Sequence, residues 1–423
     1  MNSSISESTA SPQPPTVDHS ATATARLDYL DATRAFALLL GIVFHASLSF
    51  MPIFFGWAVQ DVSTTSLALG FVTVSHSFRM ETFFLIAGFF GHMTFHRKGA
   101  ASFVISRFLR IVVPFVVGWF ILHPLIVSGW TMGAESMRGD YHFAPAIQEG
   151  FRTLAKLPNG LFTQTHLWFL YYLAMTTTIT LALRGLLMAT PRHTRTLCVR
   201  VDQSLRWIVR SPFGWLACAI PTAALLWKMR IWGVDTPDMT LVPQLPVLLL
   251  YEGFFVLGWM LHRQANLMSE FGKLTFWRWL IAGVSTSATL YFSGFQMDPG
   301  GDHYQTAHIG FVVAYAFMMW TLVRLVIGIF HHLCRKPRAW VRYLADSSYW
   351  LYLIHLPIVV WLQVAVADYN IHWSLKVCGI TAATVLISLA SYDLFVRSTL
   401  IGMILNGRRK EASLRLKWSC SKP

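Results

Sequence analysis

Long uninterrupted apolar runs dominate the chain, and polar or charged connections separate them. About ten of these runs reach the length that crosses a lipid bilayer. Because lipid offers no water to unpaired backbone groups, and because the runs are continuous rather than alternating, each run predicts a helix. The predicted spans lie near residues 32–52, 71–93, 108–128, 167–188, 213–230, 242–262, 276–296, 307–328, 343–363 and 375–396. The pattern therefore predicts an all-α, polytopic integral membrane protein with about ten transmembrane helices.

The two ends of the chain differ from the spans in composition. Residues 1–25 are rich in Ser, Thr, Ala and Pro and lack a hydrophobic period, which predicts a disordered tail rather than a secretory signal. Residues 401–423 are basic and predict a second tail. A transmembrane domain over 26–400 is expected between the two tails.

Composition and charge narrow the class further. Of the 423 residues, 54% are hydrophobic and only 13% are charged, about half the share in soluble domains, which excludes an ordinary cytosolic enzyme. The net charge of +14 would suit a nucleic-acid partner, but the Lys and Arg residues are concentrated in the connections on one side of the predicted membrane. One side of the predicted membrane carries 26 Lys and Arg, including those of both tails, and the other side carries six. This split predicts cytoplasmic termini and needs no nucleic-acid partner.

Ionisable residues inside the predicted spans are costly, so each is a candidate functional residue. Arg34 and His45 are eleven residues apart, or about three helical turns and about 16 Å, so their side chains share one face. Leu38 and Gly41 lie on that face between them. Histidine is the usual general base near neutral pH. The alternatives are a packing role for His45 and an Arg34 that reaches the inner headgroups.

The second predicted span carries Arg79 and Glu81 near its middle. Residues two positions apart differ by about 200° on a regular helix, so these side chains should point apart. Each then needs its own partner, either in a functional pocket or in an ion pair with another helix. Both are candidate catalytic residues.

A pair of arginines opens the third predicted span at its cytoplasmic side. Arg107 and Arg110 are neighbours on a helix, and paired guanidinium groups suit phosphate recognition. The alternative is that they belong to the positive charge of any inner boundary.

Polar and aromatic residues on two further spans are candidates for substrate contact. Ser348, Tyr352 and His355 share one face of the ninth span, while His166 and Trp168 open the fourth span on the outer side. An aromatic belt at the membrane boundary is the alternative for the latter pair. The five cysteines are scattered without metal-ligand spacing, so no metal site is expected.

Four motifs occur in a fixed order along the predicted spans. They are Asp31-x-x-Arg34 followed by His45, the run Phe83–Phe89, Arg107-x-x-Arg110, and Ser348-Tyr-x-x-Tyr-x-x-His355-x-Pro357. Together they resemble the membrane acyltransferase-3 family over roughly residues 26–400. Within that family the chain looks most like the glucan biosynthesis branch, which is associated with succinylation of osmoregulated periplasmic glucans.

The resemblance implies an enzyme of the bacterial inner membrane. It would move an acyl group, succinyl or acetyl, from cytoplasmic acyl-CoA to a hydroxyl of a periplasmic or cell-surface glycan. Acyl-CoA is then a donor substrate and no bound cofactor is expected. Further expected partners are membrane lipid and glucan-synthesis machinery.

The family pattern also suggests a role for each candidate residue. His45 is expected to be the base or a transient acyl acceptor, with Arg34 orienting the donor and Arg107 and Arg110 holding its phosphates. The other expected roles are pocket shaping or hydroxyl polarisation by Arg79 and Glu81, and substrate contact by Tyr352, His355, His166 and Trp168.

Two other function classes stay open at this point. A transporter or flippase of a glycan or acylated metabolite would also explain charges inside the membrane. A haem or quinone redox protein is the second alternative, because the chain has 16 histidines. Tight binding of CoA would favour the enzyme, and a haem absorption band would favour the redox protein.

Overall fold

The computed structural model describes residues 19–139, 142–155, 164–189, 191–211, 213–334, 336 and 338–406, and every regular element in these ranges is a helix. The elements are α1 (His19–Ser47), η1 (Leu48–Phe50), α2 (Ser66–Lys98), α3 (Ala100–Arg107), η2 (Phe108–Val112), α4 (Val113–Ser136), α5 (Phe143–Ala155), η3 (Thr165–Leu167), α6 (Trp168–Ala189), α7 (Pro191–Arg210), α8 (Gly214–Leu226), α9 (Leu245–Arg263), α10 (Leu267–Phe271), α11 (Phe276–Ser293), α12 (Tyr304–Leu333), α13 (Ala339–Val366), α14 (Trp373–Ser391), η4 (Tyr392–Val396) and α15 (Leu400–Asn406).

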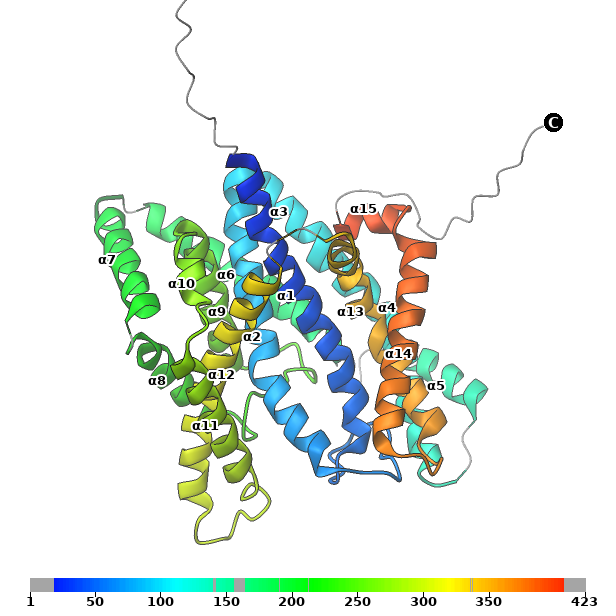
Figure 1. Ribbon diagram of the computed structural model, residues 1–423. Coiled ribbons are helices and arrows are strands. Elements are labelled where there is room, and N and C mark those ends of the chain that lie inside the picture. The colour runs from blue at the N-terminus through cyan, green and yellow to red at the C-terminus, as the bar shows by residue number, and fades with distance from the viewer. Residues whose placement is uncertain are drawn as a thin grey trace, which may run out of the picture.

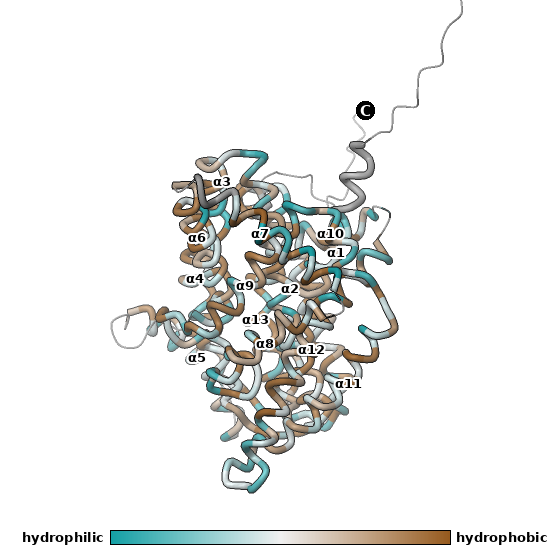
Figure 2. Tube along the Cα trace, turned by 90° about the vertical axis from the view of Figure 1, so that its left-hand side faces the viewer, coloured by the Kyte–Doolittle hydropathy of each residue, from teal (hydrophilic) through white to brown (hydrophobic). Residues whose placement is uncertain are grey.

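The long helices lie side by side in one bundle (Figure 1). The beginning of α1 and the last helix, α15, lie at the same end, which is the upper end in Figure 1. The connections from α1 to α2, from α11 to α12 and from α13 to α14 lie at the lower end. Hydrophobic residues run along most of the helices, and hydrophilic residues gather in the connections at both ends (Figure 2).

Seven helical segments are long and apolar enough to cross a membrane. They are Asp28–Phe50, Ala100–Ser136, Thr165–Ala189, Leu245–Arg263, Tyr304–Leu333, Ala339–Val366 and Trp373–Val396. An eighth arises if Thr196–Arg210 and Gly214–Leu226, which are bent by 99°, form one broken span. The all-helical, multi-pass membrane class is therefore confirmed.

The number ten stays a prediction. The apolar runs at 71–93, 213–230 and 276–296 coincide with α2, α8 and α11, and none of these helices alone is among the seven. α2 is long enough at 33 residues, but Arg79, Glu81 and several histidines lower its hydropathy. Arg79 and Glu81 are buried, so these groups face other helices rather than lipid.

Glycines bring α2 and α9 close together. A Cβ atom at Gly88 would clash with the Phe255 carbonyl, and one at Gly258 would clash with the Leu85 carbonyl. Small residues at both positions therefore let the two backbones approach, as in many membrane helix pairs. Gly91 faces aromatic rings of α9 at ordinary contact distance.

Two boundaries differ from the sequence prediction. The described residues between the predicted spans at 108–128 and 167–188 are largely helical, because α4 continues to Ser136 and α5 packs back against it at Gly150. α1 begins at His19, inside the segment expected to be a tail. Residues 1–18 and 407–423 lie outside the described residues, so most of the two predicted tails is not described.

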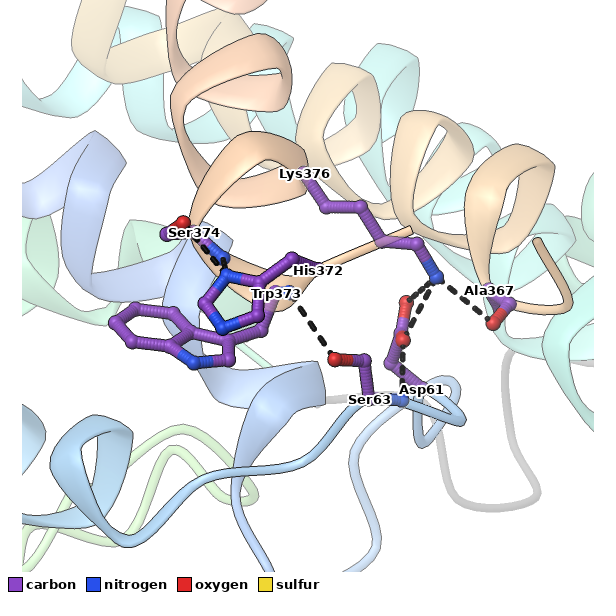
Figure 3. Close-up of polar contacts among 7 residues, drawn as sticks. All are labelled: Asp61, Ser63, Ala367, His372, Trp373, Ser374 and Lys376. Carbon is purple, nitrogen blue, oxygen red and sulfur yellow. Dashed lines mark hydrogen bonds and ion pairs between the residues drawn. The ribbon is translucent and has the colours of Figure 1, made fainter. Parts of the chain in front are cut away.

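A buried ion pair ties the connection between α1 and α2 to the end of α13 and the start of α14 (Figure 3). Lys376 Nζ donates to both carboxylate oxygens of Asp61 at 2.8 Å and to the Ala367 carbonyl at 3.2 Å. The Asp61 carboxylate also accepts from the Ser63 amide at 2.8 Å, and the Asp61 amide donates to the Ser49 carbonyl at 2.8 Å. These contacts hold the connection over 51–65 against the lower end of the bundle.

Candidate active site

A cavity of about 270 Å³ lies between α1, α2, α6 and α13, beside the junction of α3 and η2. Along α1 its wall is formed by Arg34, Leu38, Gly41 and His45. The predicted common face of these residues is thereby confirmed. The cavity runs from Arg34, in the middle of α1, to His45, near the lower end of that helix.

Arginines line the upper part of the cavity. Arg107 and Arg110 lie at the junction of α3 and η2, and η2 is a π-helix. Such extra residues in a helix occur often at functional sites, because they change which side chains share a face. The Tyr349 hydroxyl of α13 donates to the Arg110 carbonyl, and the Arg107 guanidinium lies 4.9 Å from the Phe103 ring centre.

Arg34 continues this basic lining along α1. Its Nη2 donates to the Ala345 carbonyl at 3.3 Å and lies 3.2 Å from the Asp31 carboxylate. Its Nε is buried without a hydrogen-bond partner among the described residues. The Arg34 side chain is thus partly held by α13, and its Nε–H group has no hydrogen-bond acceptor among the described residues.

His45 lies in an aromatic setting at the lower end of the cavity. Its ring stacks on Trp57, with centroids 5.8 Å apart and planes inclined by 19°, and meets the Phe44 ring edge-on at 5.1 Å. The His355 ring lies 5.2 Å away. His45 Nδ1 is buried and has no hydrogen-bond partner among the described residues. The imidazole is therefore held by ring contacts rather than by a carboxylate.

Two further histidines are fixed in a defined tautomer. His355 Nδ1 lies 2.7 Å from the Tyr352 carbonyl, and His166 Nε2 lies 2.9 Å from the Leu353 carbonyl. A carbonyl only accepts, so these nitrogens carry the hydrogen. The other nitrogen of each neutral ring is an acceptor, and the two rings are 5.3 Å apart. Together they suit the binding of a hydroxyl group.

Of Arg79 and Glu81, only Arg79 lines the cavity, in agreement with their spacing. Arg79 lines the cavity with its guanidinium 4.2 Å from the Phe44 ring centre, and a Cβ at Gly41 would lie 3.3 Å from its Nη1. Glu81 is fully buried and is not among the lining residues. The expectation that Glu81 acts directly on the substrate is therefore not supported by its position.

The other predicted site residues meet in this one cavity. It is lined by Arg34, His45, Arg79, Arg107, Arg110, His166, Trp168, Tyr352 and His355, and by Ser348 from the ninth predicted span. No cluster of three metal-ligating side chains occurs within the described ranges of the chain.

Some lining residues were not predicted. His76 of α2 lies in the cavity wall, and its Nε2 donates to the Val234 carbonyl at 3.0 Å. Thr236, from the same connection between α8 and α9, also lines the cavity. The position of His76 inside a predicted span was a usable signal, whereas a loop threonine carries none before the chain is folded.

Comparisons with known proteins identify the family of this chain. Residues 27–393 match the acyltransferase domain of the acyltransferase-3 family. The chain is 24% identical to glucans biosynthesis protein C of Escherichia coli (strain K12), over 90% of this chain and 94% of the relative. Glucans biosynthesis protein C of Salmonella gallinarum (strain 287/91 / NCTC 13346) is 24% identical with the same coverage. No solved structure matches the chain. Because the family match spans most of the chain, the protein belongs to the acyltransferase-3 family of membrane acyltransferases.

Proposed function

We propose that this enzyme transfers an acyl group from cytoplasmic acyl-CoA to a hydroxyl of a periplasmic or cell-surface glycan, with osmoregulated periplasmic glucan as the preferred candidate. The observation that carries the proposal is the polarity of the cavity described above. Arg107 and Arg110 line one part of it and His45 lines another. A donor with phosphates and a long flexible arm fits this order of groups.

The histidines support a direct attack of the acceptor on the donor. The acceptor oxygen attacks the thioester carbonyl carbon, a new C–O bond forms and the C–S bond breaks. His45 takes the hydroxyl proton and returns it to the departing thiolate, so no external proton is needed. His355 and His166 present one acceptor nitrogen each for orienting hydroxyl groups. A transient acyl group on His45 is the alternative route.

The arginines support binding of an anionic donor. Arg107 and Arg110 are proposed to hold the CoA phosphates, and Arg34 to orient the arm between them and His45. Arg79 lies deeper, with its guanidinium over Phe44, the residue beside His45. Between the two donors considered, this position favours succinyl, because its free carboxylate supplies an anion where acetyl supplies none.

We further propose that the chain has ten spans with both termini in the cytoplasm of the bacterial inner membrane. The common end of the described α1 and α15 supports an even number of crossings (Figure 1). The 26-to-six distribution of Lys and Arg supports the cytoplasmic side. Reporter fusions after residues 65, 242 and 303 should report the periplasm, and a fusion at the C-terminus should report the cytoplasm. A periplasmic C-terminus would contradict this topology.

The function is tested by mass spectrometry of periplasmic glucans from cells with the gene, without it, and with His45→Ala. We expect an acyl mass shift that disappears in the deletion and is not restored by the variant, because the base is missing. His303→Ala, an exposed histidine outside the cavity, is the matched control and should restore the shift. Immunoblots of the membrane fraction verify insertion.

Two outcomes would contradict these assignments. Full acylation by His45→Ala would remove His45 from the chemistry. If the glucans and other surface glycans are unchanged by the deletion, a glycan acceptor is wrong and the transporter alternative gains support.

A further inference from the structure

A side chain from α13 holds the backbone at the candidate base. Gln363 is 1% exposed, and its Nε2 donates to the His45 carbonyl at 2.9 Å and to the Ala46 carbonyl at 3.1 Å. Carbonyls in the last turn of a helix have no regular intrahelical partner, and α1 ends at Ser47. Gln363 therefore satisfies two buried groups and fixes the backbone of His45 at the same time.

The same amide also holds the ring that packs on the imidazole. Trp57 Nε1 donates to Gln363 Oε1 at 2.9 Å, and the Trp57 ring is the one that stacks on His45. Both polar ends of the amide are thus used. A reversed amide would turn its oxygen toward two carbonyl oxygens and its NH₂ toward the indole N–H, so the contacts select one orientation.

Trp57 is itself held by its surroundings. Its ring meets the Trp130 ring at 5.0 Å between centroids, with planes inclined by 69°. The connection that carries Trp57 is also tied down by the ion pair between Asp61 and Lys376 (Figure 3). The Trp57 ring that stacks on His45 is therefore held in a fixed position.

We propose that Gln363 is a positioning residue, which fixes His45 through its backbone and through the ring on its face. The inference rests on the proposed function, since it assumes that His45 does the chemistry. Gln363 is not among the residues that line the cavity, so it acts only through His45 and Trp57. A polar group buried in a span is unfavourable unless it is fully hydrogen-bonded, and a leucine of similar size would pack there without that demand.

The decisive variant is Gln363→Leu, measured with acyl-CoA and purified glucan in detergent. We expect kcat to fall roughly 10–100-fold while the donor KM changes less than about threefold, because a small misplacement of a reacting group affects the chemical step. The matched control is Gln264→Leu. Gln264 likewise bridges two partners, Arg206 and the Asp202 carbonyl, but it lies at the end of α9, away from His45.

A double-mutant cycle tests whether Trp57 and Gln363 act together. Trp57→Phe keeps a ring on His45 but removes the indole donor, so it should lower kcat in the native background. The same change should have a clearly smaller effect beside Gln363→Leu, because the shared hydrogen bond is already lost. If Gln363→Leu does not fold, Gln363→Glu replaces it, since this variant keeps the size and the acceptor but loses both donor hydrogens.

Imidazole ¹⁵N NMR of histidine-labelled protein gives a readout that needs no activity. Comparison with His45→Asn assigns the His45 signals, which should shift in Gln363→Leu and stay in place in Gln264→Leu. An unchanged kcat with unchanged His45 signals would overturn the positioning role. A wild type that transfers no acyl group would instead contradict the proposed function, and the NMR comparison would still decide the role of Gln363.

Discussion

Arg79 brings a guanidinium into the cavity without an ion-pair partner among the described residues. The residue is 5% exposed, and no hydrogen bond or ion pair links its side chain to any described residue. A buried cation without an ion-pair partner is unfavourable, and a bound anion would compensate its charge. The phosphates of the proposed donor are assigned to Arg107 and Arg110. We propose that the anion beside Arg79 is the carboxylate of a succinyl group.

This assignment predicts how Arg79→Met changes donor choice. With succinyl-CoA, kcat/KM should fall roughly 100-fold, because a buried charge pair that loses one partner costs about 2–5 kcal/mol. With butyryl-CoA, in which a methyl group replaces the carboxylate, the change should stay within about threefold. Steady-state rates with both donors check this. Equal losses with the two donors would show that Arg79 acts on the shared thioester instead, and Arg152→Met on α5 is the surface control.

At the scale of the elements, the ion pair between Asp61 and Lys376 decides how the connection over 51–65 is held. Burial raises the pKa of Asp61, and the hydrogen bonds from Lys376 and the Ser63 amide act in the opposite direction. The net increase indicates that desolvation outweighs the attraction between the charges. A buried ion pair of this kind is expected to serve geometry more than stability.

The single variant Lys376→Met and the double variant with Asp61→Asn should therefore differ clearly in stability. Lys376→Met alone leaves a buried carboxylate unpaired and should destabilise the protein by about 3–5 kcal/mol. Adding Asp61→Asn should recover most of that loss. Thermal unfolding in detergent measures both variants, and a double variant no more stable than the single one would contradict the argument. A variant that loosens the connection carrying Trp57 should also have a lower acylation rate.

At the scale of the whole molecule, the cavity places two different chemistries in different parts of one bundle. The guanidinium groups proposed to bind the donor phosphates come from the junction of α3 and η2, while the imidazoles come from α1, α2, η3 and α13. Only the packing of these helices puts them around one space. Phosphate binding and acyl transfer should therefore be separable by mutation.

Replacement of Arg107 and Arg110 by Gln tests this separation. The KM for acyl-CoA should rise by at least about 100-fold, since each of the two charge-assisted hydrogen bonds contributes about 1.5–3 kcal/mol, while the acceptor KM stays unchanged. With acyl-pantetheine, a donor that lacks the nucleotide phosphates, wild type and variant should be equally active. A variant that remains slower with acyl-pantetheine would show that these arginines do more than bind phosphate.

The sequence by itself determined the membrane class and most of the candidate site. Continuous apolar runs require helices in lipid, and a charged or titratable residue inside such a run is rare enough to mark a site. Helical periodicity alone put Arg34, Leu38, Gly41 and His45 on one face, and they do share the cavity wall. The same period separated Arg79 from Glu81, although it did not tell which of them faces the cavity.

Tertiary structure decided what depends on contacts between distant segments. Gln363 is 318 positions from His45, and Trp57 lies in a connection without a period, so neither could be linked to the base before the helices packed. The helical course of residues expected in a loop, and the π-helix at Arg110, likewise depend on packing against α4 and α13. Helical periodicity predicts the faces of one helix at a time, whereas the partner of a buried polar group depends on how all the helices pack.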